Sequence, residues 1–211
     1  MNQLIWVIDS PYSRATKWLL TAHNIAHQDH ILSWQTLKSD TLLKRHNPKQ
    51  QVPTFLLGDD VCGDSLLIAM RLLPFQWHQT DDAYIFRLAD SDFEAAILFF
   101  FRAKLLAEKF GPSDNSALMF AAGKETYTKA VDILFDHLMP DETAWRLNFG
   151  VVMAFSTILA CRMLSMSAEI ANYRLDDLRR LSTWIGADAH YQYLADNYST
   201  SAETELPFFI L

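Results

Sequence analysis

Ser10, Pro11 and Tyr12 stand where a short apolar run ends and a helix is predicted to begin. Proline is favoured at the first helical position, which makes Ser10 the predicted N-cap. The unpaired N–H groups and partial positive charge of a helix N-terminus attract an anion. Ser10 can therefore hold an anionic ligand atom with its hydroxyl, or it can simply cap its own helix, as serine commonly does.

A second candidate segment is Gln51-Val52-Pro53-Thr54. A proline that enters a strand from a loop is a candidate for a cis peptide bond, although a trans proline at the start of a strand is commoner. In the cis form the Val52 backbone would turn outward, and its N–H and C=O groups could pair with an extended ligand. The segment predicts either a short peptide-binding edge or an ordinary strand start.

The third segment, Gly63-Asp64-Ser65, directly precedes another predicted helix. A helix N-terminus and a serine hydroxyl suit a ligand carboxylate, and the neighbouring aspartate suits an ammonium group. An amino-acid headgroup carries both charges. The alternative is that Asp64 and Ser65 only cap the helix.

Strand and helix signals alternate along residues 1–75, the part of the chain that must position these segments. One-sided apolar faces predict the helices, and short apolar runs predict the strands. The predicted order is a strand at Leu4–Ile8, a helix from Pro11 to Asn24, a strand at Ile31–Trp34, a helical segment at Thr36–His46, a hairpin of Thr54–Leu57 with Val61–Cys62, and a helix at Leu66–Leu73. This order predicts a two-layer α/β sandwich.

Residues 76–82 are predicted to form a linker, and residues 83–211 an all-helical domain. Apolar residues recur there at helical spacing, for example Val131, Leu134, Phe135 and Leu138. The tail Pro207–Leu211 is too apolar to be left in water, so we expect it to dock on the helices. The predicted fold class is therefore α+β, with two domains.

The composition excludes several classes of function. The chain of 211 residues has a formal net charge of -7, and an acidic surface repels phosphate backbones, so no nucleic acid partner is expected. Cys62 and Cys161 cannot supply a disulfide framework or a zinc-ligand spacing. His23, His27 and His30 straddle a helix end and a strand start without an acidic partner set, so no metal is expected.

No targeting or membrane segment is predicted. The N-terminal apolar run is interrupted at Asp9, and the run Val151–Cys161 is shorter than the roughly 20 residues that cross a bilayer. We expect a cytoplasmic protein that does not bind a membrane.

The order and spacing of the three segments resemble the cytosolic glutathione S-transferase family, in its serine-type, bacterial-like form. Residues 47–53, Asn-Pro-Lys-Gln-Gln-Val-Pro, are similar to the family's Asn-Pro-x-Gly-Lys-Val-Pro stretch. Asp64-Ser65, followed by Ile68 and Leu72, is similar to its Glu/Asp-Ser-x-Ala-Ile-x-x-Tyr-Leu signature, and Ser10-Pro11-Tyr12 matches its Ser-Pro-Phe/Tyr form. The resemblance covers residues 1–73 and implies a thioredoxin-like α/β domain followed by an all-α domain.

This resemblance implies a role for each matched position. Ser10 would be the catalytic residue, donating a hydrogen bond to the thiolate of the co-substrate glutathione. The glutathione-binding positions would be Gln51 at the glycyl end, Val52 and a cis Pro53 at the cysteinyl unit, and Asp64 and Ser65 at the γ-glutamyl end. The basic cluster of Lys38, Lys44, Arg45 and Lys49 would attract the glycyl carboxylate, or it is a solvated helix face.

By the same analogy, Tyr12, Phe208 and Phe209 would line the pocket of a hydrophobic electrophile. The implied activity is that of a glutathione transferase with a role in detoxification. A homodimer is implied as well, with the helix after Ser65 and the first long helix of the second domain near its two-fold interface. The alternatives are a non-catalytic glutathione-fold binding or regulatory protein, or a glutathione-dependent peroxidase or isomerase.

Several residues depart from the family pattern. Gln50 replaces a glycine, Arg71 replaces a tyrosine, and Leu159 replaces the aspartate of a helix-capping box that would follow Ser156. Residues 10–13 also resemble the Cys-Pro-Tyr-Cys site of glutaredoxins with both sulfurs replaced by oxygen. An enzyme-borne thiol is missing there, which excludes dithiol chemistry.

Overall fold

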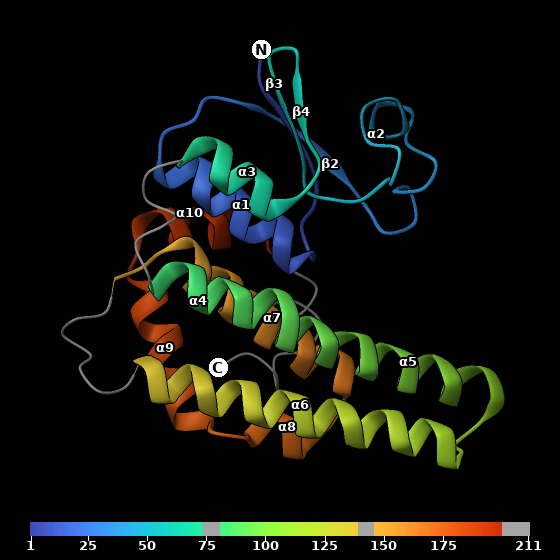
Figure 1. Cartoon of the computed structure of the whole chain (residues 1–211). Coiled ribbons are helices and arrows are strands. Elements are labelled where there is room, and N and C mark those ends of the chain that lie inside the picture. Colours follow the sequence, from blue (N-terminus) through green and yellow to red (C-terminus); the bar gives the residue numbers. More distant parts are fainter. Residues whose placement is uncertain (74–80, 139–145, 200–211) are drawn as a thin grey trace.

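The computed structural model describes residues 1–73, 81–138 and 146–199, which form an α/β part and a helical part (Figure 1). The α/β part contains β1 (Gln3–Val7), α1 (Pro11–Ala22), β2 (Gln28–Leu32), α2 (Thr41–His46), β3 (Thr54–Leu57), β4 (Asp60–Cys62) and α3 (Ser65–Leu72). The helical part contains α4 (Asp81–Leu88), the π-helical turn η1 (Ala89–Phe93), α5 (Glu94–Phe110), α6 (Asp114–Leu138), α7 (Phe149–Ser165), α8 (Ala168–Asn172), α9 (Leu175–Gly186) and α10 (Ala189–Asn197).

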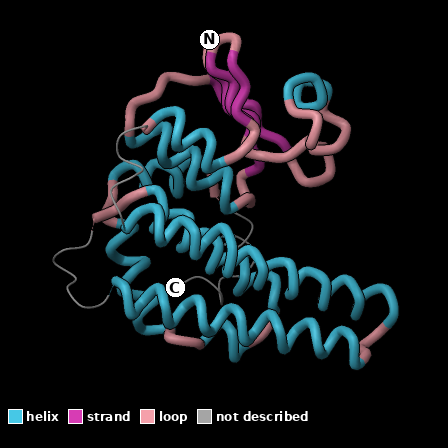
Figure 2. The backbone as a smooth tube through the Cα atoms, viewed as in Figure 1, coloured by secondary structure: helices cyan, strands magenta, loops and turns pink. Residues whose placement is uncertain are grey.

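The strands form one mixed sheet (Figure 2), and their order in it is β2-β1-β3-β4. β1 pairs in parallel with β2 and antiparallel with β3, and β3 pairs antiparallel with β4. Alternate residues of β1 point to opposite faces. Leu4 and Trp6 pack toward α1 and α3, whereas Ile5 and Val7 pack toward Leu43 of α2. This is the thioredoxin-like arrangement that the sequence predicts.

The helical part packs around α7, which is buried over most of its length because its residues are apolar on every side. α5 and α6 form a long hairpin that extends away from the sheet (Figure 1). α1 packs against α7 and α10, so the two parts share one core. Within the described residues, no helix combines the length and the apolar character that a membrane span requires.

The structure moves the starts of two elements by three residues or more, and the other predicted bounds in the α/β part by at most two. β2 lies at Gln28–Leu32 rather than at Ile31–Trp34, because parallel pairing with β1 sets its register, with Gln3 opposite Gln28. The helix predicted over Thr36–His46 begins only at Thr41, because Asp40 caps it and the preceding residues form turns.

The structure also corrects the capping box placed at Ser156. That residue lies in the middle of α7, whose N-cap is Asn148, with its side chain accepting a hydrogen bond from Val151 N. The Asp82 carboxyl of α4 accepts a second hydrogen bond from Gly150 N. The helix start is therefore capped without an aspartate at position 159. The predicted linker 76–82 lies mostly outside the described residues, and the tail Pro207–Leu211 lies entirely outside them.

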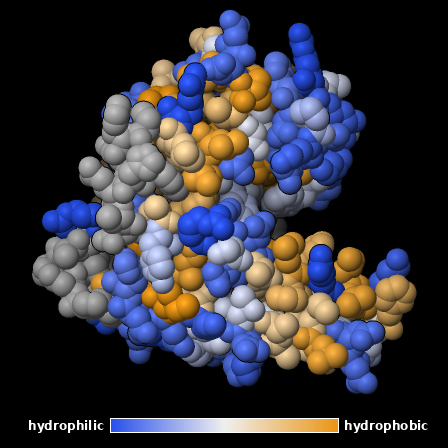
Figure 3. Space-filling view, in the orientation of Figure 1, coloured by the Kyte–Doolittle hydropathy of each residue, from blue (hydrophilic) through white to orange (hydrophobic). Residues whose placement is uncertain are grey.

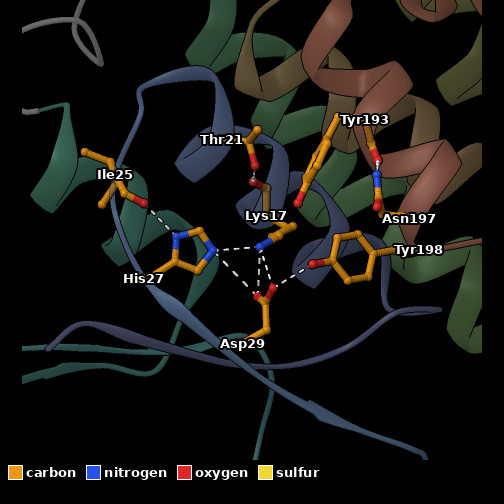
Figure 4. A network of polar contacts seen from close by, with 8 residues as sticks. All are labelled: Lys17, Thr21, Ile25, His27, Asp29, Tyr193, Asn197 and Tyr198. Atoms are coloured by element: carbon orange, nitrogen blue, oxygen red, sulfur yellow. Dashed lines mark hydrogen bonds and ion pairs between the residues drawn. The ribbon is translucent and has the colours of Figure 1, made fainter.

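A buried polar network ties the helical part to the sheet (Figure 4). Lys17 of α1, which is 4% exposed, donates to both Asp29 oxygens of β2 at 2.9 and 2.7 Å and to His27 Nε2 at 2.8 Å. Because an ammonium has no lone pair, His27 must accept at Nε2 and donate from Nδ1 to the Ile25 carbonyl, 2.6 Å away. The Tyr198 hydroxyl, just after α10, donates to Asp29 at 2.8 Å.

Candidate functional site

Residues from all three candidate segments, 10–12, 51–54 and 63–65, line a single cleft. It has a volume of about 310 Å³, and the surface is hollowed between the α/β part and the α5–α6 hairpin (Figure 3). Its lining residues are Ser10, Tyr12, Trp34, Leu37, Lys38, Gln50, Gln51, Val52, Pro53, Gly63, Asp64, Ser65, Asp90 and Glu94. All of the predicted site residues among the described part of the chain are in this set. Phe208 and Phe209 lie outside the described residues.

Ser10 is the N-cap of α1, as the sequence predicts. It is 2% exposed, and its Oγ accepts a hydrogen bond from Ser13 N at 3.3 Å. A hydroxyl that accepts with a lone pair keeps its own proton for donation. Capping and donation to a ligand are therefore compatible roles. Ser13 is fully buried and does not line the cleft.

The Val52–Pro53 peptide bond is cis, as the resemblance implies. Asn47 fixes the loop that precedes it: its Nδ2 donates to the Gln51 carbonyl at 3.1 Å and to Thr54 Oγ1 at 2.9 Å. A Cβ on Gly63 would come within 2.8 Å of Asn47 Nδ2, so only glycine lets the two segments approach this closely. The hydrogen-bonding role of Asn47 was not foreseen, although the residue belongs to the matched motif.

Gln50 stands at the position where the related motif has glycine. Its φ of 52° lies in the left-handed region, which glycine adopts without steric cost and other residues rarely adopt. The loop thus keeps a backbone geometry suited to glycine while carrying a larger side chain.

The second helix N-terminus in the cleft belongs to α3. Asp64 is its N-cap, and one carboxylate oxygen accepts hydrogen bonds from Leu66 N and Leu67 N at 2.9 and 3.1 Å. Ser65 is buried beside it and lines the cleft. The predicted cap is confirmed, and its second carboxylate oxygen remains available for a ligand ammonium.

Lys38 lines the cleft beside Gln50 and Gln51. Its Nζ donates to the Gln50 carbonyl at 3.1 Å, and the exposed ring of Trp34 lies in the same lining. Of the predicted basic cluster, Lys38 alone is a lining residue. The cleft therefore has the Lys38 ammonium next to Gln50 and Gln51, and the Asp64 carboxylate at the N-terminus of α3.

Asp90 and Glu94 are lining residues that sequence reasoning missed. Burial, and then the charge of Asp64, raises the pKa of Asp90, against the lowering effect of Arg87. Burial and the charge of Asp90 raise the pKa of Glu94. Their i, i+4 spacing is typical of a solvated helix face, so no sequence signal distinguishes them.

Tyr12 forms the wall next to these carboxyl groups. Burial, followed by the charges of Glu94 and Asp90, raises the pKa of its hydroxyl well above the usual range. The hydroxyl oxygen is buried and faces the Glu94 carboxyl, an interaction that also raises the pKa of Tyr12 and, by itself, lowers that of Glu94. This wall is therefore aromatic and acidic together.

The histidines serve other purposes. His27 belongs to the Lys17–Asp29 network, and His30 Nε2 lies 2.9 Å from an Asp40 oxygen. Among the described residues, no group of histidine, cysteine, aspartate and glutamate side chains is arranged to hold a metal ion.

Residues 4–74 match a family model described as "Glutathione S-transferase, N-terminal domain". No curated protein sequence matches the chain significantly. Solved structures share the fold across both parts of the chain. A glutathione S-transferase from Actinobacillus pleuropneumoniae is 16% identical, with a TM-score of 0.71 and 99% of each chain covered.

Two further structures of this fold contain a bound tripeptide or its analogue. One is a glutathione S-transferase from Methylobacterium radiotolerans in complex with glutathione sulfonate, 18% identical, with a TM-score of 0.69 and 93% of this chain and 94% of that chain covered. The other is a glutathione transferase family member from Pseudomonas fluorescens with bound glutathione, 18% identical, with a TM-score of 0.65 and 92% and 98% covered. Residues 4–74 are thus similar to the glutathione S-transferase N-terminal domain, and the whole chain, including its helical part, shares the fold of these solved structures.

Proposed function

We propose that the chain is a glutathione transferase of the serine type and that glutathione binds in the cleft. The observation that carries this proposal is the charge layout of the cleft. Glutathione has an amino-acid headgroup at one end, a carboxylate at the other and a thiol between them. The α3 N-terminus with Asp64 and Ser65 suits the headgroup, and Lys38 with Gln51 suits the carboxylate.

In this proposal the Val52 backbone pairs with the cysteinyl unit and Ser10 donates to the sulfur. The thiol gives its proton to solvent, and the thiolate attacks an electrophilic carbon. A carbon–sulfur bond forms, and a leaving group such as chloride departs with the electron pair of its former bond. Lowering a thiol pKa of about 8.5 by two units requires roughly 2.7 kcal/mol. One charge-assisted hydrogen bond, worth about 1.5–3 kcal/mol, and one helix N-terminus, worth about 0.3–1 kcal/mol, can supply it.

We also propose that this enzyme works as a homodimer in the cytoplasm. Exposed apolar side chains support a dimer: Leu67 and Met70 on α3, and Leu98 and Phe101 on α5. Figure 3 shows further apolar surface on the protruding α5–α6 hairpin. A two-fold pairing of α3 with the partner's α5 would cover both sets. Light scattering at tens of micromolar tests this assembly, and a monomer mass would contradict it.

The first experiment on function is titration of the purified chain with glutathione, followed by turnover of a neutral chloronitrobenzene. A ligand that binds only the folded state stabilises it by about 2.7 kcal/mol at a hundredfold excess over Kd. We expect a higher melting temperature and formation of the aromatic thioether. If millimolar glutathione gives neither heat nor a shifted melting curve, the proposal fails.

The second candidate is a protein that binds glutathione without activating it. The position of Glu94 and Asp90 in the cleft wall favours this candidate, because nearby negative charge raises the pKa of a thiol. Glutathione binding with an unshifted thiol pKa and without thioether formation would support it.

A further inference from the structure

The segment around the cis proline is held together by hydrogen bonds among its own residues. Gln50 N donates to the Asn47 carbonyl at 2.8 Å. The Gln51 carbonyl accepts from Asn47 Nδ2 at 3.1 Å and from Thr54 Oγ1 at 2.8 Å. These contacts join residues that are three or four positions apart. They do not include the carbonyl of Gln50, which is bonded from elsewhere in the chain.

The partner of that carbonyl is Lys38, whose Nζ lies 3.1 Å away. Lys38 precedes Gln50 by twelve residues and lies in the turns before α2. Both residues line the cleft. Within residues 47–54, Gln50 alone has a positive φ, 52°, a conformation that is unfavourable for a residue with a Cβ but not for glycine. The one contact from outside the segment is therefore made at its strained residue.

We propose that Lys38 is a positioning residue for glutathione: its hydrogen bond keeps Gln50 in the left-handed conformation and thereby keeps the Val52 backbone in place for the cysteinyl unit. This inference rests on the proposed function and adds a second role for Lys38. The two roles are compatible, because an ammonium group has three N–H donors and the Gln50 carbonyl takes one of them.

The physical basis is a conformational equilibrium of the segment. Without the contact from Lys38, Gln50 leaves the left-handed region more often, and the segment spends a smaller fraction of its time in the binding conformation. The apparent Kd of a ligand rises as that fraction falls. A glycine at position 50 adopts the left-handed conformation without support, so the effect of Lys38 on binding depends on which residue stands there.

A double-mutant cycle tests this dependence. Wild type, Lys38→Met, Gln50→Gly and the double variant are titrated by calorimetry with glutathione and with its glycyl ethyl ester, whose C-terminus is neutral. In the wild-type background, Lys38→Met should weaken the ester about three- to fivefold. In the Gln50→Gly background the same change should weaken it by less than about 1.5-fold. Glutathione should lose more than the ester in both backgrounds, because its carboxylate also loses a cation.

Two further variants serve as controls. Lys38→Arg keeps a charged donor and should retain the affinity for the ester to within about twofold. Lys129→Met removes the same charge from an exposed position on α6, outside the cleft, and should leave both Kd values unchanged. Because both lysines are exposed, we expect every variant to fold, which circular dichroism checks.

The outcomes separate this inference from the proposed function. If Lys38→Met weakens glutathione but not the ester, Lys38 acts only through its charge, so the inference is wrong and the proposed function stands. If Lys38→Met causes the same fold-loss of affinity in both backgrounds, Lys38 does not act through Gln50, and the inference is again wrong. If glutathione does not bind the wild type at all, the proposed function fails and this inference fails with it.

Discussion

The cleft and the Lys17–Asp29 network are both polar regions in which residues of the α/β part and of the helical part meet, but they differ in how charge is compensated. In the network, the Lys17 ammonium reaches both oxygens of Asp29, and Tyr198 and His27 complete the set (Figure 4). In the cleft, Glu94 has no ion pair with a described cation, and burial and the charge of Asp90 raise its pKa. A polar group satisfied by its own protein stabilises the fold, whereas one left unsatisfied in a cleft is suited to a ligand.

The largest effect is expected from breaking the network. Asp29→Asn removes the carboxylate that compensates Lys17, so the free energy of unfolding should fall by about 3 kcal/mol or more. Urea unfolding measures the loss. Asp176→Asn is the control, because its pair with Arg179 lies on the surface and should contribute less than about 1 kcal/mol. An equal loss of unfolding free energy in Asp29→Asn and Asp176→Asn would show that the buried network contributes no more to stability than a surface ion pair.

The network also predicts a dependence of stability on pH. Burial alone would raise the pKa of Asp29, but its contacts with His27, Lys17 and Tyr198 outweigh burial and hold the pKa well below its usual range. A lowered folded-state pKa gives stability that is present above the unfolded pKa of about 3.9 and is lost as the pH falls toward the folded value. The stability gap between wild type and Asp29→Asn should therefore shrink below about pH 4.

That gap can be followed by urea unfolding at successive pH values between about 5 and 2. A constant gap across this range would show that ionised Asp29 does not stabilise the fold.

In the cleft, substitution of Ser10 should affect the ligand as well as the helix. Ser10→Ala removes the cap, which costs about 0.5–2 kcal/mol of stability. It also removes the proposed donor to the thiolate, so the pKa of the thiol of bound glutathione should rise by one to two units, or roughly 1.4–2.7 kcal/mol. Thiolate absorbance near 240 nm, followed against pH in the complex, measures this change.

Ser13→Ala is the matched control for Ser10. The Ser13 hydroxyl is buried, without a hydrogen-bond partner in the described ranges, and its backbone N–H still caps onto Ser10 in the variant. The thiol pKa should therefore barely change. A larger shift of the thiol pKa in Ser13→Ala than in Ser10→Ala would show that Ser10 is not the residue that donates to the thiolate.

The smallest effect is expected at the loop before Pro53. Gln50→Gly relieves a left-handed residue, a gain of about 1–2 kcal/mol that the flexibility of glycine in the unfolded chain reduces by about 0.5–1 kcal/mol. A net stabilisation of up to about 1 kcal/mol should appear as a higher melting temperature. Gln51→Gly lacks this relief and should destabilise. The same sign in both variants would contradict the argument.

Much of the site was predictable because its signals are local. Ser10 before Pro11, and Asp64 before Ser65, specify caps through contacts within one helical turn. The cis bond at Pro53 was inferred from the motif that surrounds it. The strand at Ile31–Trp34 and the cap at Ser156 were misplaced, because the register of β2 depends on β1 and the start of α7 depends on Asp82 of a distant helix.

By itself, the sequence determined the order of elements in the α/β part, the helical character of the rest, and the three segments that line the cleft and are proposed to bind glutathione. Only the tertiary structure brought Glu94 and Asp90 into the same cleft as Ser10, and Lys17 into contact with Asp29 and Tyr198. Caps and proline turns depend on neighbours along the chain. Whether a charged helical residue faces solvent, a buried partner or a cleft depends on how the helices pack. The spacing of apolar residues along a helix does not predict which of these it will be.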